Sequence, residues 1–229
     1  MSGTETLIAS LGAGGQDFEQ RSEDCLYLNI WVPPSVLEGE KKSVLFFVHG
    51  GSFIGGNANR LETNGRTLAV EQDVIVVSVQ YRNGSIFSFV DLTLEMMQKY
   101  PLERLGVYGF GYVSRRRDEN VGHFEQGNFG LQDVRLALRI VHENIHFFGG
   151  DNSRITIMGN SAGAIITGLL LSDEAPVYFR DAGWPFFQGA VMQCTPVNIQ
   201  MRTPAQIIDF NNKIADAAGC ETLEDRLKY

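Results

Sequence analysis

Four short apolar runs, each bounded by turn-forming residues, recur along the chain. They occupy residues 44–48, 74–79, 155–158 and 190–192 and are rich in β-branched side chains. Short runs of this kind are typical of strands that are buried on both faces, as the strands of a parallel sheet are. The pattern therefore predicts four buried parallel strands.

A different periodicity occupies the interval between the second and third runs. Within residues 131–147, apolar side chains recur in steps of three, four, three and four, at Leu131, Val134, Leu138, Val141 and Ile145. These steps place the five side chains on one face of a helix. Strands that alternate with helices predict an α/β fold, in which a mostly parallel sheet carries helices on both faces.

The third run leads directly into the motif Gly-Asn-Ser-Ala-Gly at residues 159–163. We expect a strand over 155–158, a tight turn over 159–163 and an apolar helix over 164–171, the order in which a nucleophilic serine is exposed between a strand and a helix. The glycines are needed beside Ser161 because such a turn is strained and leaves no room for Cβ atoms. Ser161 is therefore the candidate nucleophile.

A second loop of small residues, His-Gly-Gly-Ser-Phe at 49–53, follows the first strand. Its backbone N–H groups could approach a bound ligand. Together with the N–H of Ala162 they could form an oxyanion hole, which stabilises the negative oxygen of a tetrahedral intermediate. Alone, this loop could be a plain glycine turn after a strand. The two motifs together favour the catalytic interpretation.

The histidines do not complete this machinery. Where a serine nucleophile lies between a strand and a helix in this way, the triad acid and then the histidine follow it along the chain. His49, His123, His142 and His146 all precede Ser161. His142 and His146 have a spacing that can bind a metal, but no acid or cysteine is placed to complete the site, and a polar helix face explains them. We expect no metal site and no cofactor.

Composition excludes several classes of partner. The 229 residues carry a net charge of −8, which favours solubility and argues against a nucleic-acid or anionic-membrane surface. We expect no transmembrane span and, because the N-terminus lacks the basic start and apolar core of a signal peptide, a cytoplasmic location by default. Cys25, Cys194 and Cys220 are too far apart for a zinc site or redox pair, so we expect reduced or partly buried thiols.

Four segments in fixed order resemble the type-B carboxylesterase and cholinesterase family. They are residues 22–31, 47–53, 127–133 and 148–164. The resemblance implies an α/β-hydrolase fold, a small-molecule ester substrate and no cofactor. Members of this family are often secreted or reside in the lumen of the endoplasmic reticulum.

The resemblance also assigns roles to individual residues. It implies that Ser161 is the acylating nucleophile and that the amides of Gly51, Ser52 and Ala162 bind the oxyanion. Ser52 replaces a usual Gly or Ala, which is tolerable because the amide does the work. Asn160 replaces a usual Glu and so removes a negative charge beside the site.

Only the N-terminal part of the family pattern is present. Family members are more than twice as long, and their triad acid, usually Glu, and their triad His correspond to no residue of this chain. Cys25 and Cys220 each match one half of a family disulfide. The resemblance therefore implies a partial domain over residues 22–229 that is incomplete at both ends, preceded by a poorly ordered segment over 1–21.

Residues 83–104 interrupt a family motif, and their deletion restores it. We predict that they are an inserted loop or a translated intron, with a genuine lid element as the alternative. They contain Ile86, Phe87, Phe89 and Val90, which are apolar enough to pack as a helix.

Three functions stay open. The first is a serine carboxylic-ester hydrolase that acts through an acyl-enzyme on Ser161 and is inactive as this truncated chain, because no triad acid or His can be placed. The second is a non-catalytic binding or adhesion relative like the neuroligins, although such relatives generally lose the nucleophile that this chain keeps. The third is a truncated product with no function of its own.

Overall fold

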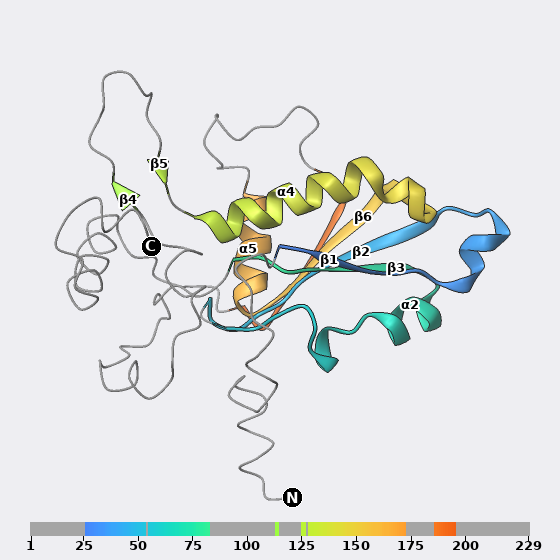
Figure 1. The fold of residues 1–229 in the computed structure, drawn as a ribbon, viewed down its shortest axis with the longest axis horizontal. Helices are drawn as coiled ribbons and strands as arrows, with labels where there is room; N and C mark the ends of the chain where they lie inside the picture. Colours follow the sequence, from blue (N-terminus) through green and yellow to red (C-terminus); the bar gives the residue numbers. More distant parts are fainter. Residues whose placement is uncertain are drawn as a thin grey trace, which may run out of the picture.

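A computed structural model describes six stretches of the chain, which include every strand and helix predicted above (Figure 1). They are residues 26–53, 55–82, 113–114, 125–126, 128–172 and 186–195. The predicted terminal segment 1–21 and the predicted insertion 83–104 lie outside them, as do Cys25, Cys220 and His123.

A five-stranded sheet forms the centre of the described fold, in the order β1-β3-β2-β6-β7. The strands are β1 (Leu28–Trp31), β2 (Lys42–Val48), β3 (Ile75–Val79), β6 (Gly150–Asn160) and β7 (Gly189–Gln193). All neighbours are parallel except β1, which runs antiparallel to β3. The four predicted strands are thus confirmed as β2, β3, β6 and β7, and the sheet is mostly parallel. The prediction that all four are buried is wrong for β7, which lies at the edge of the described sheet and has no buried residue.

The described residues include three α-helices beside the sheet. They are α2 (Arg66–Gln72), α4 (Phe129–Asn144) and α5 (Ala162–Leu171). The predicted helix 131–147 corresponds to α4 followed by a 3-10 turn, η5 (Ile145–Phe148), and all but the first residue of its apolar stripe is fully buried. Gly149, with a φ of 78°, ends η5 in the left-handed conformation that glycine adopts without strain.

Several short elements were not predicted. Two 3-10 turns, η2 (Pro34–Glu38) and η3 (Leu61–Thr63), lie in the connections between strands. A separate two-stranded ribbon pairs β4 (Val113–Ser114) with β5 (Glu125–Gln126) in antiparallel fashion. None of these elements carries a residue of the predicted site.

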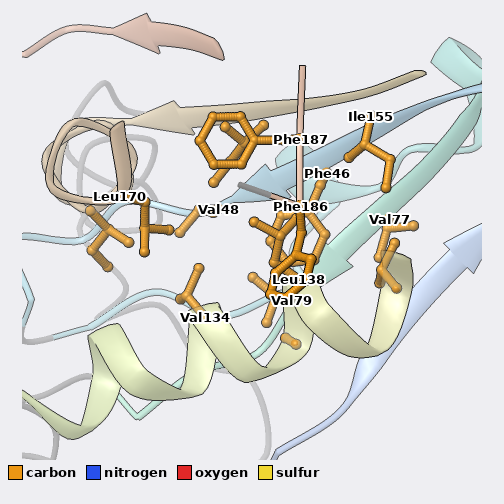
Figure 2. Close-up of a cluster of buried hydrophobic side chains, with 14 of the residues drawn as sticks. Phe46, Val48, Val77, Val79, Val134, Leu138, Ile155, Leu170, Phe186 and Phe187 are labelled. Atoms are coloured by element: carbon orange, nitrogen blue, oxygen red, sulfur yellow. The ribbon is translucent and has the colours of Figure 1, made fainter. Parts of the chain in front are cut away.

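Helices lie on both faces of the sheet (Figure 1). Val77 and Val79 of β3 belong to the same buried cluster as Val134 and Leu138 of α4, as Figure 2 shows. Val76 points to the opposite face, where it packs against Gly65 at the start of α2. Successive residues of a strand alternate between its faces, so α4 and α2 cover opposite sides. The predicted layer arrangement is confirmed.

The buried cluster on the α4 side also includes residues of α5 and of the segment before β7. Figure 2 shows Leu170 of α5 and the aromatic pair Phe186 and Phe187 packed toward Phe46 and Val48 of β2. This cluster fixes α5 against β6, and α5 begins immediately after Ser161. The core therefore positions the candidate nucleophile.

Strand β7 forms one edge of the described sheet. Its residues Val191 and Met192 are 41% and 50% exposed. Cys194, directly after this strand, is a free and exposed thiol rather than a partly buried one.

Among the described helices, none combines the length and the apolar character that crossing a membrane requires.

Candidate active site

Ser161 is the single residue between strand β6 and helix α5. Its φ of 52° and ψ of −116° lie far from both strand and helix values, and a positive φ is unusual for a residue with a Cβ atom. The predicted five-residue turn is therefore wrong in extent, because β6 runs to Asn160 and α5 begins at Ala162. The chain reverses direction within one strained residue, which projects the serine from the end of the strand.

The two glycines of the motif make this reversal possible. A Cβ atom at Gly159 would lie 2.1 Å from the carbonyl oxygen of Gly163, and one at Gly163 would lie 2.1 Å from the carbonyl oxygen of Val48. Both distances are far shorter than any real contact of a Cβ atom. Close backbone approach, rather than turn conformation, is therefore what requires glycine at these positions.

Backbone hydrogen bonds hold Ser161 from both sides. Its N–H donates to the carbonyl of Gln193 in β7 at 2.9 Å, and its carbonyl accepts from the N–H groups of Ala164 and Ile165 at 2.9 and 3.1 Å. Ala162 is the first residue of α5, so its N–H has no partner within the helix and stands at the positive end of the helix dipole. This amide is suited to an anion beside Ser161.

The glycine-rich loop of residues 49–53 lies against the turn that carries Ser161, the candidate nucleophile. A Cβ atom at Gly50 would lie 2.7 Å from the carbonyl oxygen of Asn160 and 3.1 Å from the Cβ atom of Ser161. The next residues, Gly51 and Ser52, have φ angles of 130° and 56° and are exposed. The structure thus brings the loop that carries two of the predicted oxyanion residues beside the turn that carries Ser161 and Ala162.

The loop is a tight, closed turn. The N–H of Gly55 donates to the carbonyl of Gly51 at 3.0 Å, and a Cβ atom at Gly51 would lie 2.1 Å from the carbonyl oxygen of Gly55. Phe53, although its φ is 62°, buries its side chain in the core cluster. The turn therefore presents backbone to the site, and the buried side chain of Phe53 anchors it.

Side chains of β1 and of the residues directly after β3 fix both ends of this loop, and the sequence did not reveal them. The Tyr81 hydroxyl donates to the carbonyl of His49 at 2.8 Å. Beyond the loop, the N–H of Ala58 donates to the Gln80 Oε1 at 2.8 Å, and the Asn29 Nδ2 donates to the Ala58 carbonyl at 3.0 Å. These partners are more than twenty residues apart in the chain, so no local pattern could have paired them.

The three described histidines do not hydrogen-bond to the Ser161 hydroxyl. His49 is buried, with its Nδ1 2.8 Å from the Gly50 carbonyl oxygen, and burial lowers its pKa to about 4. The ring centroids of His142 and Phe186 are 5.2 Å apart. Those of His146 and Phe147, both in η5, are 4.0 Å apart. Within the described stretches, no cluster of three His, Cys, Asp or Glu side chains could hold a metal ion.

Comparison with known proteins places this sequence in a family. A family model described as the carboxylesterase family matches residues 6–99 and 103–228. Acetylcholinesterase 1 of Caenorhabditis briggsae is 37% identical over 162 residues, which are 70% of this chain and 22% of that protein.

Other relatives carry related names. Human carboxylesterase 3 is 40% identical over 170 residues, 74% of this chain and 24% of the relative. The juvenile hormone esterase of Tribolium castaneum is 40% identical over 210 residues, 90% of this chain and 30% of the relative. The matched part therefore spans less than a third of each of these relatives. Because the family model matches nearly the whole sequence, the chain belongs to the carboxylesterase family.

Proposed function

We propose that the chain carries the nucleophile half of a serine carboxylic-ester hydrolase, with Ser161 as the residue that is acylated. The observation that carries this proposal is the strained backbone of Ser161 between β6 and α5, with the glycine-rich loop packed against it. A positive φ at a residue with a Cβ atom persists only where the surrounding structure enforces it. The esterase names of the relatives support the same reaction class.

The proposed reaction follows from the groups present. The Ser161 hydroxyl oxygen attacks the carbonyl carbon of a small ester, and the C=O electron pair moves onto the oxygen. The amides of Gly51, Ser52 and Ala162 stabilise that oxyanion; one such donor typically contributes about 10²- to 10³-fold to the rate. The C–O bond to the alcohol then breaks, and water later hydrolyses the acyl-enzyme. No cofactor takes part.

Proton transfer is the step that the described residues do not supply. His49 is a poor base because its pKa is lowered to about 4, and its Nδ1 already contacts the Gly50 carbonyl oxygen. His142 and His146 contact phenylalanine rings instead. Loss of the base reduces the rate by several powers of ten even when the oxyanion hole is intact. We therefore propose that the 229-residue chain alone does not turn over ester.

Exogenous imidazole provides a test, because a small base can substitute for a missing histidine. The full chain is incubated with p-nitrophenyl acetate, with and without imidazole, and acetylated peptides are mapped by mass spectrometry. Imidazole should accept the Ser161 proton, so that an acetyl group appears on Ser161 while p-nitrophenolate leaves.

Two variants control this experiment. Ser161→Ala should lose the adduct, whereas Ser172→Ala, which changes the hydroxyl at the other end of α5, should keep it. Acetylation of many surface residues at equal levels, with no preference for Ser161, would contradict the proposal.

We also propose that residues 83–104 are an insertion in the family domain. The proposal rests on the family motif, which is restored when deletion of this segment joins Tyr81 and Arg82 to Leu105 and Gly106. Sequencing of the transcript across this segment tests the proposal. A mature transcript that lacks the corresponding codons would support it, and a conserved in-frame segment of the same length in every transcript would favour a genuine lid element.

A further inference from the structure

The peptide group between Gly50 and Gly51 is held in one orientation by the side chain of the preceding residue. The Nδ1 atom of His49 lies 2.8 Å from the Gly50 carbonyl oxygen. A carbonyl oxygen only accepts hydrogen bonds, so Nδ1 must carry the proton. The neutral imidazole is therefore the Nδ1–H tautomer, with a lone pair on Nε2.

This tautomer agrees with the surroundings of the ring. His49 is 2% exposed, and its Nε2 has no hydrogen-bond partner. With Nδ1 protonated, a second proton on the buried Nε2 would make the ring a cation with an unsatisfied donor, which is more unfavourable than an unpaired acceptor. Burial lowers the pKa of His49 to about 4, so the ring stays neutral near pH 7.

Planarity of the peptide bond transmits this contact to the next residue. In a trans peptide the C=O of one residue and the N–H of the next point in opposite directions. When the Gly50 carbonyl points at the His49 ring, the Gly51 N–H must point away from that ring. We propose that His49 is a positioning residue, which aims the Gly51 N–H at the oxyanion site beside Ser161 by holding the Gly50 carbonyl.

Gly50 and Gly51 explain why this peptide group needs a side-chain hydrogen bond to fix its orientation. A peptide group flanked by glycines meets little steric resistance to rotation, because neither residue has a Cβ atom. Gly50 needs its small size, since a Cβ atom there would lie 3.1 Å from the Ser161 Cβ atom. The close approach of the loop to Ser161 therefore requires a residue that does not itself fix the orientation of the peptide group, and the side-chain hydrogen bond favours one orientation.

The contact between His49 and Gly50 is enclosed. A Cβ atom at Gly56 would lie 2.2 Å from the Gly50 carbonyl oxygen and 2.8 Å from the His49 Nδ1, so the Gly56 backbone covers both atoms. The ring of Tyr81 stacks on His49 with centroids 4.4 Å apart and an interplanar angle of 23°. These neighbours keep the imidazole in place and keep water from competing for the carbonyl.

The proposal is tested first on the unmodified protein. Nitrogen NMR of the full chain, with 15N-labelled histidine at pH 7, reports the tautomer of each ring. For His49 we expect a protonated Nδ1 and an unprotonated Nε2. A proton on Nε2 would overturn the proposal, and this readout needs neither a variant nor catalytic activity.

A pair of variants then separates positioning from packing. His49→Phe keeps an aromatic ring to stack on Tyr81 but has no donor, and His49→Asn places an amide N–H donor near the position of Nδ1. We expect His49→Phe to shift the Gly50 carbonyl carbon and Gly51 amide resonances, and His49→Asn to return them toward the wild-type positions. Unchanged resonances in a folded His49→Phe protein, or no recovery in folded His49→Asn, would overturn the proposal.

A third readout connects this arrangement to the proposed function, on which the oxyanion role of Gly51 rests. Imidazole-dependent acetylation of Ser161 should fall about 10²- to 10³-fold in His49→Phe, the loss expected for one oxyanion donor, and recover in His49→Asn. If the wild-type chain is never acetylated at Ser161, the proposed function fails while the NMR result still decides the role of His49. Equal acetylation in all three proteins would overturn the positioning role.

Discussion

Gly159 and Gly163 face each other across Ser161, so closely that a Cβ atom at Gly159 would lie 2.1 Å from the carbonyl oxygen of Gly163. The last residues of β6 and the first turn of α5 therefore pack backbone to backbone around Ser161. Gly163 continues this packing to β2, because its α-carbon faces the Val48 carbonyl. The strand, the helix and the nucleophile turn form one unit.

Substitution of Gly163 should disrupt this unit. In Gly163→Ala the new methyl group would lie 2.1 Å from the Val48 carbonyl oxygen, and neither backbone can move without displacing β2 or α5. We expect the free energy of unfolding to fall by about 3 kcal/mol or more, at the upper end of overpacking effects. Urea unfolding followed by circular dichroism measures this change.

Gly168→Ala in the same helix is the matched control. Here the nearest atom to the new methyl group is the Met192 sulfur at 3.4 Å, an ordinary contact. Because alanine favours helix over glycine by up to about 1 kcal/mol, we expect a neutral or stabilising effect. Similar losses at both positions would mean that the close approach at Gly163 is not the cause.

The ion pair between Arg82 and Asp133 should also contribute strongly. The Asp133 carboxylate, 8% exposed, accepts from the backbone N–H, Nε and guanidinium NH₂ of Arg82 at 3.0, 2.8 and 2.6 Å. Removal of one partner of a buried pair leaves the other charge uncompensated. Arg82 is partly exposed to solvent. We therefore expect Asp133→Asn to lower the free energy of unfolding by about 2–4 kcal/mol.

An exposed pair on the same helix provides the comparison. Arg139 and Glu143 are four residues apart on α4, with the Nε and Oε1 atoms 2.8 Å apart, and both side chains are open to solvent. Such pairs stabilise a helix by less than about 0.5 kcal/mol. If Glu143→Gln destabilises the protein as much as Asp133→Asn does, burial is not what makes the Arg82 pair strong.

The exposed edge of β7 predicts self-association. This strand bears no charged residue, and Val191 and Met192 are largely open to solvent. An uncharged, apolar sheet edge is a template for pairing with another chain. We expect the wild-type chain to show concentration-dependent association in static light scattering, and Val191→Lys to reduce it.

Leu37→Lys is the control for this effect, because Leu37 is 93% exposed but lies in η2, outside the sheet. It should leave the association unchanged. A monodisperse wild-type monomer, or an equal effect of both lysine substitutions, would show that the β7 edge does not drive association.

Burial of His49 predicts a pH dependence of stability. Its pKa is lowered from 6.5 to about 4, mainly by burial and also by the charge of Arg60, while the Gly50 carbonyl opposes the shift. Between pH 6.5 and about pH 4, His49 binds a proton in the unfolded chain but not in the folded chain. The free energy of unfolding should therefore fall as the pH drops through this range. The loss from this one group is about 2–3 kcal/mol at pH 4.5.

Urea unfolding at pH 7.5 and pH 4.5 measures this loss, and His49→Asn should show a smaller one. His146→Asn, which changes an exposed ring, should keep the wild-type dependence. An identical pH dependence in His49→Asn and the wild type would show that His49 does not titrate in this window.

How far the sequence predicted the fold depends on which residues are buried. Strands β2, β3 and β6 were recognisable because their apolar side chains face the core. Strand β1 was missed because all four of its residues are only half-buried, so no strong pattern marks it. Helix α2 was missed for a similar reason, since Ala69 is its single buried residue.

In the candidate site, the local features were predictable from the sequence and the long-range contacts were not. The spacing of Gly159, Ser161 and Gly163 was visible because it serves a local reversal of the chain. The contact of Tyr81 with His49 could not be predicted, because it depends on how β2 and β3 lie side by side. The extent of the turn was misjudged because the glycines are needed for close approach of the backbones and not for turn conformation.

The initial rate of hydrolysis of p-nitrophenyl acetate, compared between the full chain and its Ser161→Ala variant at pH 7.5 without added imidazole, tests the central claim most directly. Ser161 is the proposed nucleophile and the amides of Gly51, Ser52 and Ala162 are its proposed oxyanion donors, but none of the three described histidines hydrogen-bonds to the Ser161 hydroxyl. We therefore predict equal rates for the two proteins. Turnover well above the Ser161→Ala rate would contradict the account, because it would require a base for Ser161 within these 229 residues.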